Sequence, residues 1–88
     1  MKRYDKNTDY FKIWLDDKKA LLNTMIKNMI SDLEAGCDYF GENIKKQREA
    51  IRIYKHQIDT QLMIMTEFSD EKINKWCYMD LIRKGVIE

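Results

Sequence analysis

The chain has 88 residues, a formal net charge of +1, 44% hydrophobic and 35% charged residues, and no proline. Its length predicts one domain, and the absence of proline permits long helices. The near-neutral charge excludes a general electrostatic attraction to nucleic acid or to anionic membranes. No apolar run approaches the about 20 residues of a membrane-spanning helix, and no signal-peptide core is found. We therefore expect a single helical domain, 1–88, in the cytoplasm, without a membrane partner.

The first part of the sequence predicts an N-terminal arm over 1–8 and a helix over 9–35. Apolar residues recur there at the spacing of one helix face: Phe11, Leu15, Leu22, Ile26, Met29 and Leu33. The opposite face is polar and of mixed charge: Lys12, Asp16, Lys19, Asn23 and Lys27. Gly36 can adopt the left-handed conformation that closes a helix, so we expect a tight turn after it.

A second helix, predicted over 41–68, is the element around which the chain is organised. Its apolar residues recur at heptad spacing and form a seam: Phe40, Ile44, Ile51, Tyr54, Ile58, Met65 and Phe68. A helix with such a face needs a partner to bury it, and a short connection between two helices is typical of an antiparallel pair. The sequence therefore predicts a long, coiled-coil-like helical hairpin.

A shorter third helix is predicted over 70–84, between a capping residue, Ser69, and the glycine Gly85. Its inward face is apolar: Ile73, Trp76, Cys77 and Leu81. We expect this helix to pack at the open end of the hairpin, across both long helices. The predicted fold class is thus all-α.

Three apolar residues of the second helix, Ile53, Met63 and Ile64, fall outside the seam. A lone hairpin would expose them to water, and contiguous exposed apolar surface is typical of association sites. We therefore expect a homodimer that completes a larger helical bundle.

The side chains that most often carry nucleophilic or metal chemistry are few: Cys37, His56 and Cys77. The predicted hairpin places Cys37 at its tip and Cys77 in the third helix, too far apart for one ion or a disulfide. His56 and Cys77 alone do not make a structural zinc site. We predict no catalytic, cofactor-binding or metal-binding residues, and hence no enzyme.

One surface feature has internal order, a basic stripe on the second helix formed by Lys45, Arg48, Arg52 and Lys55. Its spacing puts four cations on one helix flank, where they could face an acidic protein, follow the phosphates of a nucleic acid, or simply be solvated. Trp76 of the third helix is the alternative candidate for contact with a partner. The sequence leaves these possibilities open.

The tail Asp80–Glu88 resembles the end of a recognition helix and the first wing strand of winged-helix DNA-binding domains, which would imply DNA binding. The sequence departs from that family because no second wing strand follows and the preceding helices are far longer. In general character the chain resembles small helical phage and mobile-element products, including some anti-CRISPR proteins. We expect a non-catalytic protein-binding adaptor or inhibitor, with a dimeric nucleic-acid-binding accessory protein as the alternative.

Overall fold

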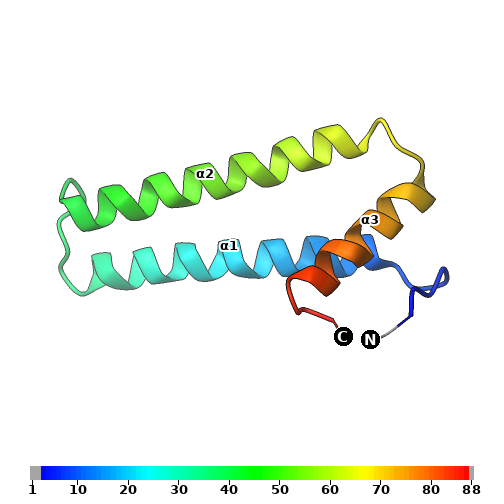
Figure 1. Ribbon diagram of the computed structural model, residues 1–88. Helices are drawn as coiled ribbons and strands as arrows, with labels where there is room; N and C mark the ends of the chain where they lie inside the picture. The colour runs from blue at the N-terminus through cyan, green and yellow to red at the C-terminus, as the bar shows by residue number, and fades with distance from the viewer. Residues whose placement is uncertain (1–2, 88) are drawn as a thin grey trace.

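The computed structural model describes residues 3–87 and contains three α-helices in that range. They are α1 (Tyr10–Glu34), α2 (Glu42–Met65) and α3 (Asp70–Arg83). Figure 1 shows α1 and α2 side by side and antiparallel, with α3 crossing α1 at the open end of the hairpin. No strand occurs within the described range, so the predicted all-α class is confirmed. The molecule is elongated, with extents of 48 × 27 × 16 Å.

Local signals in the sequence account for the ends of the helices. The Asp9 side chain caps α1 by accepting a hydrogen bond from the Lys12 amide at 3.0 Å, and Ser69 caps α3 from the Lys72 amide at 3.3 Å. Gly36 follows α1 with a φ of 100°, as predicted for a helix-closing glycine.

The seam of α2 is buried within the helix, most deeply toward its two ends. Ile44, Ile58 and Met65 are buried, whereas Ile51 and Tyr54 are half-buried. The prediction that the seam extends from Phe40 to Phe68 was wrong at both ends. Phe40 is 81% exposed and Phe68 is 45% exposed, and both lie outside α2. The reason is local, since α2 begins at Glu42 and ends at Met65, so the heptad spacing does not hold for the flanking phenylalanines.

The third helix packs on α1 and meets α2 only near the end of that helix, so the expectation that it lies across both long helices was wrong. The buried cluster at this end combines residues of all three helices: Tyr10, Trp14, Met65, Cys77 and Leu81. It is dominated by aromatic side chains at the beginning of α1, on a flank of that helix that the hairpin alone leaves open.

A turn, and not a wing strand, follows α3. The Gly85 amide donates to the Ile82 carbonyl at 3.1 Å, and the Val86 amide donates to the Leu81 carbonyl at 3.0 Å. This pair of bonds closes the helix in the Schellman arrangement, with Gly85 at a φ of 73°. Ile87 then packs against the buried cluster, so the segment after α3 contributes to the core.

Candidate functional site

Asn74 holds the first half of α3 against the beginning of α1. Its Oδ1 accepts hydrogen bonds from the amides of Tyr10 at 2.7 Å and Phe11 at 3.2 Å. Its Nδ2 donates to the Thr8 carbonyl at 2.9 Å and to the Tyr4 hydroxyl at 3.3 Å. The first amides of a helix have no partner within the helix, so this one side chain satisfies two of them from a distant segment.

Asp80 holds the second half of α3 in the same way. It is 4% exposed, and its carboxylate accepts from Trp14 Nε1 at 2.9 Å and lies 3.2 Å from Lys84 Nζ. Arg83 also donates to it. Burial alone would raise the pKa of Asp80, but the hydrogen bonds from Trp14, Lys84 and Arg83 outweigh it and hold the pKa below its usual value.

Lys18 completes this polar contact from the side of α1. It is only 6% exposed, and its Nζ lies 5.4 Å from the centre of the Trp14 ring. Burial, together with the nearby Lys84, lowers the pKa of Lys18. Lys18 and Asp80 are charged residues of amphipathic helices. The sequence pattern alone would therefore place both side chains in solvent.

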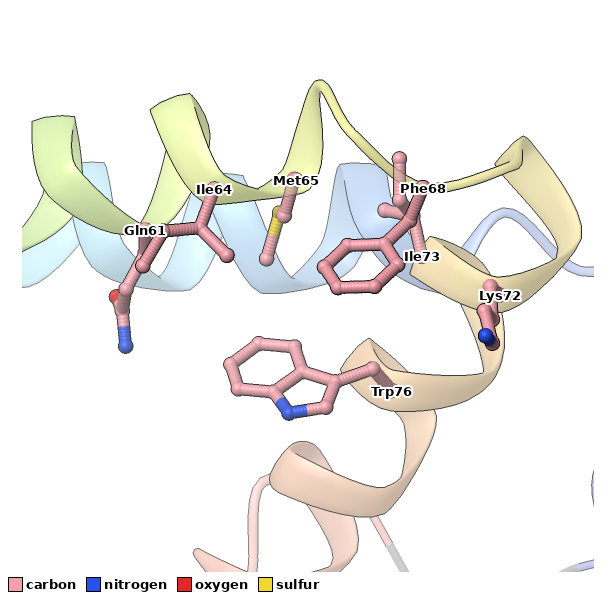
Figure 2. A pocket seen from close by; sticks show the side chains of 7 residues that line it. All are labelled: Gln61, Ile64, Met65, Phe68, Lys72, Ile73 and Trp76. Atoms are coloured by element: carbon pink, nitrogen blue, oxygen red, sulfur yellow. The ribbon is translucent and has the colours of Figure 1, made fainter.

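Since α3 is bound to α1, it diverges from α2 and leaves an apolar pocket of about 280 Å³ between them (Figure 2). The pocket, which we call the α2–α3 pocket, is lined by Gln61, Ile64, Met65, Phe68, Lys72, Ile73 and Trp76. Figure 2 shows the Trp76 ring facing Ile64 and Met65 across the opening. Apart from the Gln61 amide and the Lys72 amine, the lining side chains are apolar, so the pocket offers mainly apolar contact.

Trp76 lies at the border of the core rather than inside it. It is 41% exposed, and its ring stands edge-on to the buried Trp14 ring, with centroids 5.7 Å apart and an interplanar angle of 71°. This support fixes one edge of the pocket, while Ile64 at 52% and Phe68 at 45% remain exposed on the opposite edge. Sequence reasoning placed Trp76 on the inward face, and the structure places it at the border between the core and solvent.

One lysine lines the rim of the α2–α3 pocket. Lys72 lies with its Nζ 5.5 Å from the centre of the Phe68 ring. Lys75, three residues further along α3, is exposed but does not line the pocket. The pocket therefore combines apolar walls with one cation at its edge.

The predicted basic stripe is only partly available. Lys45 and Lys55 are exposed, but Arg52 forms an ion pair with Glu49. Arg48 donates to the Tyr39 hydroxyl at 3.1 Å, and its guanidinium carbon lies 4.6 Å from the centre of the Tyr39 ring.

The stripe and Trp76 are not brought together. The stripe lies on the half of α2 nearest the hairpin tip, whereas Trp76 lies at the open end of the hairpin. They are two separate candidate surfaces, and a partner that binds one need not contact the other.

The two thiols differ in their exposure to solvent. Cys37 is exposed near the hairpin tip and Cys77 is buried. Burial, followed by the nearby carboxylates of Asp80 and Asp9, raises the pKa of Cys77 to about 12, so this thiol stays protonated and unreactive at neutral pH. Among residues 3–87, no three side chains of histidine, cysteine or acidic type are grouped to hold a metal ion.

Comparison with known proteins adds no assignment. No protein-family model, curated protein or solved structure matches the chain. Within the part of the chain that the structure describes, no helix carries an apolar stretch long enough to cross a bilayer.

Proposed function

We propose that the chain is a non-catalytic protein-binding domain and that the α2–α3 pocket is its binding site. The observation that carries this proposal is the half-exposed Trp76 at the edge of an open apolar pocket. Tryptophan is among the residue types most enriched at energetic hot spots of protein interfaces. Exposed apolar side chains gathered around such a pocket are typical of an interaction site.

The partner's chemistry follows from the walls and the rim. A large apolar side chain would fill the pocket, and acidic residues beside it would meet Lys72 and Lys75. A short amphipathic helix with one apolar anchor and carboxylates around it has both features, and helix-in-groove recognition is a common mode of peptide binding. Complementary charge at the rim would set the orientation of the helix and speed its association.

Such a domain would act in the cytoplasm by covering a surface of a larger protein, as an adaptor or as an inhibitor encoded by a phage or mobile element. Self-association belongs to the same proposal. Ile53 and Ile64 of α2 are 46% and 52% exposed, and these exposed apolar side chains support a homodimer.

A direct test uses a synthetic helical peptide with a single central phenylalanine flanked by glutamates. Titration calorimetry should show saturable binding, and Trp76→Ala should abolish it while circular dichroism shows an intact fold. Met63→Ala is the matched control, because Met63 is 72% exposed on α2 and does not line the pocket. Equal binding by wild-type and Trp76→Ala protein, or no binding to any acidic peptide with an apolar anchor, would overturn the proposal.

The second candidate, a nucleic-acid-binding accessory protein, is supported by the exposed Lys45 and Lys55 on the basic stripe. Binding through phosphate contacts must weaken steeply as salt rises, whereas binding through an apolar pocket should not. Retention of the protein on DNA at low and physiological salt, compared with that of a Lys45→Glu, Lys55→Glu variant, separates the two candidates.

A further inference from the structure

The tip of the hairpin, residues 35–41, presents an aromatic side chain to solvent. Phe40 is 81% exposed, and its ring meets Tyr39 edge-on at a centroid distance of 5.1 Å. Asp38 orders this turn, because its side chain accepts from the Phe40 amide at 3.1 Å and its carbonyl accepts from the Gly41 amide at 3.0 Å. Phe40 is therefore displayed by an ordered turn.

Acidic residues flank this aromatic side chain in the sequence, while the Arg48 guanidinium lies against the neighbouring Tyr39 ring. The segment 32–42 contains four carboxylates, Asp32, Glu34, Asp38 and Glu42, and no lysine or arginine. An apolar anchor flanked by carboxylates is the chemistry that the α2–α3 pocket and its basic rim fit. The chain thus carries both halves of one interaction, at opposite ends of its hairpin.

We infer that the hairpin tip of one copy docks in the α2–α3 pocket of a second copy, with Phe40 as the anchor. Tip and pocket lie at opposite ends of α2, so two hairpins placed antiparallel bring each tip to the partner's pocket. Both pockets are then filled by the same contact, which closes a two-fold dimer and leaves no free end to form a fibre.

The size of the pocket and the surface between its two ends support this arrangement. A cavity of about 150 Å³ is enough to hold benzene, and the pocket of about 280 Å³ has room for the phenyl ring of Phe40. Ile53 precedes Ile64 by three helical turns and lies on the same side of α2. With Ile53 46% exposed and Ile64 52% exposed, that side offers further apolar area to the second hairpin.

This inference rests on the proposed function, because it assigns the same pocket a second occupant. The dimer is then the closed form of the protein, and an external partner must displace the tip before it binds. Partner binding and dimerisation would be mutually exclusive, and the apparent affinity for the partner would fall as protein concentration rises.

Light scattering and sedimentation equilibrium on single variants provide the first test. Wild-type protein should be dimeric. Both Phe40→Ser and Trp76→Ala should weaken the dimer about a hundredfold to ten-thousandfold, because each variant removes one large apolar side chain from both of its tip–pocket contacts. Phe40→Ser should leave helicity unchanged since Phe40 is already exposed, and Met63→Ser should change neither mass nor helicity. A wild-type monomer from micromolar to millimolar concentration, or a dimer unaffected by Phe40→Ser, would overturn the inference.

Charge reversal provides a sharper test, because it can restore as well as remove the contact. A variant with a basic tip, Glu34→Lys with Glu42→Lys, and a variant with an acidic rim, Lys72→Glu with Lys75→Glu, should each dimerise weakly alone. Mixed together they should form a heterodimer, since both of its tip–pocket contacts pair opposite charges. Failure of the mixture to form heterodimers would refute docking of the tip in the pocket.

The two proposals fail in different ways. If the acidic peptide binds the pocket but the protein is monomeric, pocket recognition stands and tip docking falls. If the dimer forms through Phe40 and Phe40→Ser protein binds no acidic peptide, tip docking stands and the pocket serves self-association alone.

Discussion

The four hydrogen bonds of Asn74 predict a large loss of stability on Asn74→Ala. Each hydrogen bond contributes about 1 kcal/mol net, so the set stabilises the fold by about 4 kcal/mol. Alanine has a higher helix propensity than asparagine, which offsets this loss by about 0.5 kcal/mol or slightly more. The expected decrease in the free energy of unfolding is therefore about 3 kcal/mol, a large part of the stability of a small domain.

Urea unfolding followed by circular dichroism measures this change, with two further variants for comparison. Asn74→Asp keeps the acceptor at the N-terminus of α1 but loses both donated bonds, so it should lose about half as much. Asn23→Ala, at an exposed position of α1, should be neutral or slightly stabilising. A change below about 1 kcal/mol for Asn74→Ala would refute the contact between α3 and the beginning of α1.

Three further outcomes are expected. Because the pKa of Asp80 is lowered in the folded state, this carboxylate stabilises the fold fully above the unfolded pKa of about 3.9, and that stabilisation is lost as pH falls through the lower folded pKa. Asp80→Asn should therefore reduce the loss of unfolding free energy on acidification. The exposed control Asp16→Asn should not. Ile58→Asp places a carboxylate at a site that is 6% exposed and should cost more than about 3 kcal/mol, which a preserved melting temperature would contradict. A thiol reagent should modify Cys37 rapidly and Cys77 only after denaturant is added, and equal rates would show that Cys77 is not buried.

The helices could be predicted from the sequence because their signals are local. Apolar spacing, a capping serine before α3 and glycines after α1 and α3 act within a few residues, and each does so in the structure. The exposed positions of Ile53, Met63 and Ile64 also followed from spacing, since they lie off the seam.

The sequence correctly placed α3 at the open end of the hairpin, but its attachment to α1 could not be predicted in this way. That attachment depends on contacts of Asn74 and Asp80 with the beginning of α1, and a helical pattern assigns polar residues to solvent. The pocket beside Trp76 is a consequence of that attachment, so the sequence identified Trp76 as a candidate without showing what surrounds it. Phe40 was misplaced because heptad spacing does not show where a helix begins.

The attachment of α3 to α1 has a consequence for synthesis of the chain on the ribosome. Trp14 and its partner Asp80 are separated by 66 positions, and the N-terminal part of a chain leaves the ribosome first. The aromatic side chains of Tyr10 and Trp14 therefore remain open to chaperones or to neighbouring chains until α3 has been released and packs on α1. A stop codon or protease cut within α3 therefore does more than shorten the protein: it uncovers the largest aromatic surface of its first helix.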